Sequence, residues 1–194
     1  MPTYPADGQC LAQDNQTIAT LTNMSQVTGK WWILKGLNCG QKGWPAGFDY
    51  FPCQRDEFVL DAGGKWVDHI AYCGGSDNNC TTPIVNTVAN VSITSPGVMT
   101  HWYTDPPLTP QTEEWRVLSW PDQGDWMLYI YCGSTPLGPY AGGSVVSRQA
   151  TPTSPRLQLT DIPADIEAEF KKVAAQFAFS YDGMCVSDVS TCSD

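Results

Sequence analysis

The stretch IVNTVANVSITSPGVMTHWY, residues 84–103, decides the fold class that we expect for this chain. Apolar and polar residues alternate along its first half, as they do on a β-strand with one buried and one exposed face. The residues that share one face are Val85, Thr87, Ala89, Val91 and Ile93. Ser95-Pro96-Gly97 interrupts the pattern before a second run starts. The stretch therefore predicts an antiparallel hairpin of strands 84–94 and 98–103.

Six more short runs of β-branched and aromatic residues follow this period-two pattern, separated by Gly, Pro, Asn and Asp. The strands that they predict are 31–37, 57–61, 65–72, 114–120, 126–132 and 143–148. The turn Ala62-Gly63-Gly64 is short enough to join two of them as a second hairpin. We therefore expect an all-β chain over most of its length.

One segment after the last expected strand has helical periodicity instead. The residues of its apolar stripe are Ile166, Phe170, Val173 and Phe177. This spacing predicts an amphipathic helix that packs on other elements. We expect Thr160 or Asp161 to cap its start, Pro163 to lie in its first turn and Gly183 to follow its end.

Eight antiparallel strands in chain order, followed by one helix, fit a closed up-and-down barrel better than a sandwich, because closure removes every unpaired edge. Such a barrel has room for one small ligand, or its own side chains fill it, and the sequence leaves both open. We expect an N-terminal extension over 1–26, the barrel over 27–150, and a connector, helix and tail over 151–194.

The charge balance narrows the possible partners. The 194 residues include 10 Lys plus Arg against 20 Asp plus Glu, a formal net charge of −10. This sign disfavours nucleic acid, whose phosphates attract basic surfaces. No run of about 18 apolar residues predicts a membrane span, and the first residues lack the layout of a signal peptide. Acidification toward about pH 5 would neutralise part of the charge, so acid response and simple solubility are both open interpretations.

The cysteines indicate disulfides rather than a metal site. Their positions are Cys10, Cys39, Cys53, Cys73, Cys80, Cys132, Cys185 and Cys192. An even number without a repeated C-x-x-C pair, beside 2 His, disfavours zinc and predicts an oxidising compartment. Cys73 with Cys80, and Cys185 with Cys192, are local pairs that could close short loops, and other pairings stay open.

Motifs spread over most of the chain resemble one known family. Gly29-Lys30-Trp31 is similar to the Gly-x-Trp signature of lipocalins. Further stretches resemble the lipocalin-like domain of violaxanthin de-epoxidase, and they are Phe48-Asp49-Tyr50-Phe51-Pro52-Cys53-Gln54, Glu113-Glu114-Trp115-Arg116-Val117-Leu118-Ser119, residues 125–133 and Gly142-Gly143-Ser144-Val145-Val146. The similarity covers about residues 27–185.

The resemblance implies a barrel that binds a xanthophyll in the chloroplast thylakoid lumen, where the de-epoxidase removes epoxide oxygens with ascorbate when the lumen acidifies. It makes Asp49 and Glu113 candidate proton donors, and Tyr131 matches a tyrosine of the family. Opening an epoxide needs a proton on its oxygen, which a buried carboxylic acid can supply. The resemblance also implies a disulfide between Cys53 and Cys185.

Three positions depart from the motifs of the family. Pro52 stands where the family has an acid, Asp56 where it has a histidine and Ser147 where it has a tyrosine. The plant enzymes also carry a cysteine-rich domain before the barrel and a Glu-rich tail after it, and neither is recognisable here. These departures favour a binding or structural relative over a working de-epoxidase.

Aromatic side chains are candidates for the wall of a pigment-binding cavity, although each could instead belong to the core. The candidates are Trp31, Trp66, Trp102, Trp115, Trp126 and Tyr129.

Three functions remain open on the sequence. The first is a non-catalytic lipocalin that binds a xanthophyll or another carotenoid, without metal, as an accessory subunit of a light-harvesting or photosystem complex. The second is an active de-epoxidase that uses ascorbate. The third is an extrinsic scaffold with a filled barrel. Glycosylation acceptor patterns begin at Asn15, Asn23, Asn79 and Asn90, and glycans there would argue for the secretory route against the lumen.

Overall fold

The computed structural model describes residues 20–37, 53–72, 85–103, 111–135, 138–148, 162–177 and 179–187. The strands in these ranges are β1 (Gly29–Gly36), β2 (Arg55–Leu60), β3 (Trp66–Tyr72), β4 (Val85–Ser95), β5 (Val98–Tyr103), β6 (Gln111–Ser119), β7 (Trp126–Thr135), β8 (Gly138–Ser147) and β9 (Cys185–Val186). The helices are α1 (Ala164–Gln176) and the 3-10 turns η1 (Met24–Val27) and η2 (Pro121–Gln123).

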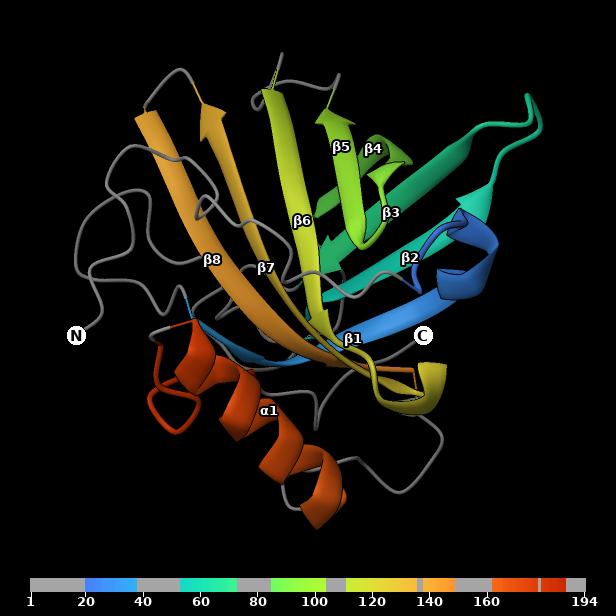
Figure 1. The fold of residues 1–194 in the computed structure, drawn as a ribbon. Coiled ribbons are helices and arrows are strands. Elements are labelled where there is room, and N and C mark those ends of the chain that lie inside the picture. The colour runs from blue at the N-terminus through green and yellow to red at the C-terminus, as the bar shows by residue number, and fades with distance from the viewer. Residues whose placement is uncertain are drawn as a thin grey trace.

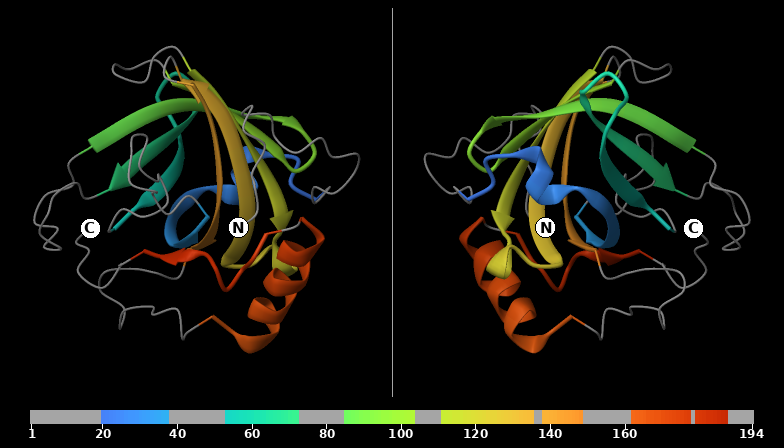
Figure 2. Two further views of the ribbon diagram at one scale, coloured as in Figure 1. Left: turned by 90° about the vertical axis from the view of Figure 1, so that its left-hand side faces the viewer. Right: turned by 90° about the vertical axis from the view of Figure 1, so that its right-hand side faces the viewer.

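The first eight strands close into a barrel, as the sequence predicts. Strands β2 to β8 pair in chain order, and β1 pairs antiparallel with both β8 and β2. The register Gly29↔Phe58 joins β1 to β2, and Trp32↔Ser147 joins it to β8. Figures 1 and 2 show the strands wrapping around one interior, with α1 outside. Closure leaves β1 no free edge along the barrel wall.

The hairpin of β4 and β5 is present with the expected turn, in which Gly97 has a φ of 76° that favours glycine. Strands β6 and β8 begin earlier than expected, at Gln111 and Gly138 instead of 114 and 143. Their first residues lack an alternating apolar pattern and pair through the backbone, for example Gly138 with Thr135. The two-residue strand β9, which extends the sheet beside the end of β1, was not predicted.

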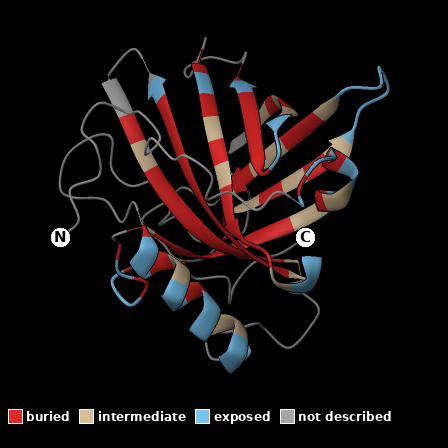
Figure 3. Ribbon diagram, in the orientation of Figure 1, coloured by how far each residue is buried: buried red, intermediate tan, exposed pale blue. Residues whose placement is uncertain are grey.

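The strand β7 is buried on both faces, which explains its nearly continuous apolar sequence. Met127, Tyr129 and Tyr131 belong to the cluster inside the barrel. The alternate residues, Trp126, Leu128 and Ile130, belong to a second cluster outside the barrel. Figure 3 shows β7 buried and the solvent side of α1 exposed. The outer cluster exists because α1 covers this part of the barrel wall.

The helix packs its predicted stripe onto the barrel. Phe170 is fully buried in the outer cluster, and Ile166 and Val173 pack against that cluster. The Ser119 hydroxyl of β6 donates a hydrogen bond to Glu169 of α1. The N-cap is Pro163, without a side-chain capping bond, and the two predicted caps lie outside the described residues. No helix in the described ranges is long and apolar enough to cross a membrane.

One end of the barrel is filled with apolar side chains. The residues packed there are Leu21, Met24, Val27, Trp31, Met99, Val117, Trp120, Met127 and Val146. The segment 20–27 reaches across this end, and the Trp31 indole N–H donates to the Val27 carbonyl at 2.7 Å. This end, the base of the barrel, is therefore a packed core.

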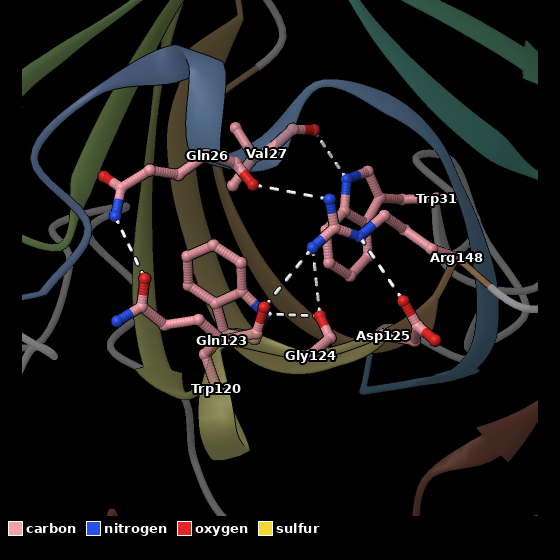
Figure 4. A network of polar contacts seen from close by, with 8 residues as sticks. All are labelled: Gln26, Val27, Trp31, Trp120, Gln123, Gly124, Asp125 and Arg148. Carbon is pink, nitrogen blue, oxygen red and sulfur yellow. Dashed lines mark hydrogen bonds and ion pairs between the residues drawn. The ribbon is translucent and has the colours of Figure 1, made fainter.

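Arg148 seals the base from outside (Figure 4). Its guanidinium carbon lies 4.4 Å from the ring centroid of Trp31 and 5.8 Å from that of Trp120. The same group donates to the carbonyls of Gln26 at 3.4 Å and Gly124 at 3.1 Å. One side chain thus ties η1, η2 and the first strand together.

Cys53, Cys132 and Cys185 are disulfide-bonded. The pairing of Cys53 with Cys185 that the resemblance implies stays a prediction. Cys73 and Cys80 lie outside the described residues.

Replacing Arg148, which covers the base, gives a first prediction. Arg148→Ala removes charge-assisted hydrogen bonds and the cation–π contact, so we expect it to lower the free energy of unfolding by about 2–3 kcal/mol. Urea denaturation measures this. Lys172→Ala, at an exposed position of α1, is the control and is expected to cost less than about 0.5 kcal/mol. Equal losses in the two variants would contradict a sealing role for Arg148.

Candidate ligand-binding site in the barrel

A cavity occupies the barrel at the end opposite the base. Its empty volume is about 650 Å³, including the space where it opens to solvent. The lining includes Tyr72 at the end of β3, Tyr103 at the end of β5 and Gln111 at the start of β6. The barrel is therefore packed at the base and hollow at its other end.

Stacked aromatic rings form the floor and one wall of the cavity. The rings of Trp115 and Tyr129 are nearly parallel, at 8°, with centroids 4.3 Å apart. His101 lies 4.2 Å from Trp115 on the β5 side, and Phe58 meets Trp115 edge-on at 6.2 Å. Trp115 and Tyr129 line the cavity directly. Such a stack offers a flat apolar surface to an unsaturated ring.

Two glycines make room for the tyrosines of the cavity. In the register, Gly133 of β7 lies between Glu113 of β6 and Tyr140 of β8. A Cβ at position 133 would lie 2.5 Å from the Tyr140 hydroxyl oxygen. A Cβ at Gly142 would overlap the ring of Tyr131 in the same way. Gly133 therefore lets Tyr140 lie across β7 and reach Glu113 of β6, and Gly142 leaves space for the Tyr131 ring.

The Glu113 carboxylate is the centre of the polar part of the cavity. The Tyr140 hydroxyl donates to its Oε2 at 2.5 Å. The Tyr103 hydroxyl at 3.3 Å and the Trp115 indole N–H donate to its Oε1. Gln111 Nε2 in turn donates to the Tyr140 hydroxyl at 2.8 Å. A carboxylate removed from water needs such donors, and this one accepts three bonds from its neighbours.

The environment keeps the two tyrosines protonated. Burial raises the pKa of Tyr103 well above its ordinary value, and the nearby Glu113 adds to the effect. Burial and then Glu113 likewise raise the pKa of Tyr140. Both hydroxyls therefore act as permanent hydrogen-bond donors to Glu113.

A second titratable pair lies beside the Trp115 ring. Asp68 Oδ2 of β3 and His101 Nε2 of β5 are 3.2 Å apart, and both side chains are fully buried. Burial, followed by the charge of Glu113, raises the pKa of Asp68. Burial lowers the pKa of His101 to about 4. The neutral forms of both groups are therefore favoured over a buried ion pair.

Four of the predicted site residues come together at the cavity: Glu113, Tyr131, Trp115 and Tyr129. Asp49 lies outside the described residues. The other candidates are elsewhere. Trp31 is in the base, and Trp66 packs partly buried against the cluster inside the barrel.

Two expected wall residues point away from the interior. Trp126 lies in the outer cluster under α1. Trp102 is 38% exposed on the outer face of β5, where it pairs with Asn90 of β4. The alternation along a strand predicts which residues share a face. It does not predict which face is inside, because apolar residues occur on both faces wherever α1 or a neighbour covers the outside of the barrel.

The sequence reasoning missed several lining residues. Tyr103, Gln111 and Tyr140 line the cavity, as does Asp56, which stands where the family has a histidine. Asp68 and His101 were also missed. The available signal was strand parity, because Asp68 alternates in phase with Ile70 and Tyr72, which line the cavity. In the described residues, no three side chains of the types that bind metals converge.

Adding a methyl group at Gly133 tests whether the hydrogen bond between Tyr140 and Glu113 depends on this glycine. Gly133→Ala is expected to displace Tyr140 from Glu113 and to cost about 2–4 kcal/mol through overpacking and the lost bond. Urea denaturation measures the loss. Gly63→Ala, in the exposed turn between β2 and β3, is the control with an expected cost below about 1 kcal/mol. A Gly133→Ala protein as stable as this control would show that Tyr140 does not need the space at Gly133 to reach Glu113.

The Asp68 pair gives a prediction on pH. A carboxyl whose pKa is raised in the folded state destabilises the fold as the pH rises above its unfolded value, near 4. Asp68→Asn cannot ionise. Its free energy of unfolding minus that of the parent protein is therefore expected to be larger at pH 7.5 than at pH 4, so that the variant gains relative stability as the pH rises. Urea denaturation at both pH values measures the difference. A change in the opposite direction would show that Asp68 is ionised in the fold.

Comparisons with known proteins agree with this architecture. The family model of the VDE lipocalin domain matches residues 3–188. The crystal structure of the major allergen Per a 4 from cockroaches has a TM-score of 0.65 at 16% identity, over 96% of this chain and 98% of that one. Lobster apocrustacyanin A1 has a TM-score of 0.61 at 12% identity, over 97% and 93%. A comparison with curated proteins finds no match. The two structures support the lipocalin fold, and the family model shows that the chain belongs to the VDE lipocalin domain family.

Proposed function

We propose that this lipocalin binds a xanthophyll, with one oxygenated end ring of the pigment in the barrel cavity. The observation that carries the proposal is that the polar cluster of Glu113, Tyr103 and Tyr140 lies beside the Trp115–Tyr129 stack in one cavity. A xanthophyll end ring has the matching chemistry, because it combines an apolar unsaturated ring with an oxygen substituent. The aromatic stack packs on the ring, and the polar cluster meets the oxygen.

The proposal includes a location and a host. The resemblance to violaxanthin de-epoxidase supports a place in the thylakoid lumen, and an antenna or photosystem complex as the host. Mass spectrometry of the natively isolated protein tests the location at Asn23 and Asn90, the acceptor positions in the described ranges. Unmodified asparagines are expected. Glycans at either position would contradict the lumen, because they would show passage through the secretory route.

De-epoxidation is the second candidate, and a specific observation favours it. Glu113 and Tyr131 line the cavity together with a second carboxylate, Asp56. In that reaction ascorbate supplies two electrons and two protons, the epoxide oxygen leaves as water and the carbon–carbon double bond of the ring is restored. Glu113 is the acid that would protonate the leaving oxygen. Non-catalytic binding remains our principal proposal, because two family acid–base positions carry Pro52 and Ser147.

Titration with zeaxanthin tests the binding proposal. Saturable quenching of tryptophan fluorescence with one ligand per chain is the expected result. Trp115→Leu is expected to weaken binding more than about tenfold, because it removes half of the aromatic stack. Trp102→Leu is the matched control on the outer face and should bind as the parent protein does, with folding checked by circular dichroism. No binding, or loss only in Trp102→Leu, would contradict a pigment site in the barrel.

Incubation with violaxanthin and ascorbate near pH 5 separates binding from catalysis. We expect bound pigment without conversion, which chromatography of the extracted pigment measures. Product that disappears in Glu113→Gln would replace the principal proposal with the second candidate.

A further inference from the structure

We propose that Gln111 is a specificity-determining residue, whose side-chain carbonyl selects a ligand ring that carries a hydroxyl group. This inference rests on the proposed function and names the substituent that the cavity recognises. It also assigns Glu113 and Tyr140 as positioning residues, because they fix which end of the Gln111 amide is available to the ligand.

The hydrogen-bond chain fixes the direction of each donor. The Tyr140 hydroxyl carries one proton, which it donates to Glu113 Oε2 at 2.5 Å. The Tyr140 oxygen is then left as an acceptor for Gln111, at 2.8 Å. Only the NH₂ end of the Gln111 amide can donate there. The carbonyl end of Gln111 must therefore point away from Tyr140.

The carbonyl end of Gln111 has no hydrogen-bond partner. The residue is 8% exposed and lines the cavity, and its Oε1 atom is buried without a partner. An unsatisfied buried acceptor costs about 1–3 kcal/mol. A ligand hydroxyl can donate to this atom and recover that energy. An ether or ketone oxygen has no proton to donate, so it leaves the acceptor unsatisfied.

Glu113 controls this preference through the geometry of its two oxygens. Trp115 and Tyr103 both donate to Oε1, so in Glu113→Gln the amide oxygen would take the place of Oε1. The new NH₂ group would then face Tyr140 and donate to it. The Tyr140 proton would turn to Gln111, whose amide would rotate to accept it. Gln111 would then present its NH₂ group, a donor, to the ligand.

Two ring ligands that differ in one methyl group test the inference. The probes are 3-hydroxy-β-ionone, which can donate a hydrogen bond, and 3-methoxy-β-ionone, which can only accept one. We expect the parent protein to bind the hydroxy ligand about tenfold more tightly, measured by quenching of tryptophan fluorescence. Gln111→Leu is expected to reduce this ratio to about one. Gln176→Leu, exposed at the end of α1, is the matched control and keeps the ratio.

Glu113→Gln gives a readout that a purely structural role would not produce. It is expected to bind the methoxy ligand several-fold more tightly than the parent protein does, because Gln111 then offers a donor to the ether oxygen. Gln111→Leu has no donor and is expected to show no such gain. Circular dichroism establishes that both variants fold.

The outcomes separate this inference from the proposed function. Equal affinities of the parent protein for the two probes, with zeaxanthin still bound, would overturn the role of Gln111 and leave pigment binding intact. An unchanged ratio in Gln111→Leu would also overturn it. Failure of the parent protein to bind zeaxanthin and both probes would overturn the inference and the proposed function together.

Discussion

A carboxylate inside a closed barrel must be satisfied by the barrel's own side chains, and the site depends on how Glu113 meets this constraint. Its three donors come from β5, β6 and β8, so the bonds can form only when those strands are in register. Gly133 is needed because the donor from β8 must cross β7. The polar centre is therefore a consequence of barrel closure as much as of local sequence.

The two ends of the barrel differ in their role: the base stabilises the fold, and the other end contains the proposed ligand site. At the base, apolar side chains pack together, and Arg148 ties the segment before β1 to the loop before β7. At the other end, a cavity holds titratable groups that are costly to bury. Polar groups inside a protein are retained at a cost where they serve recognition or chemistry, which is consistent with a ligand site at this end.

Most strands and the helix could be predicted because their periodicity is local, and β5 spans the predicted residues 98–103. The start of β8 could not be predicted, because Gly142 and the residues before it follow no apolar alternation, although their backbone pairs with β7. Trp126 was misjudged as a cavity residue because α1 buries the outer face of β7. The proximity of Asp68 and His101 depends on three strands lying side by side, and no spacing along the chain encodes it.

The most direct test of a pigment ring in the barrel is a crystal structure of the protein with bound zeaxanthin. The account predicts electron density for one end ring inside the cavity, within about 4 Å of Trp115 and Tyr129, with the ring oxygen beside the Glu113 cluster. An empty cavity with pigment on the outer face of the barrel, near Trp102, would contradict it.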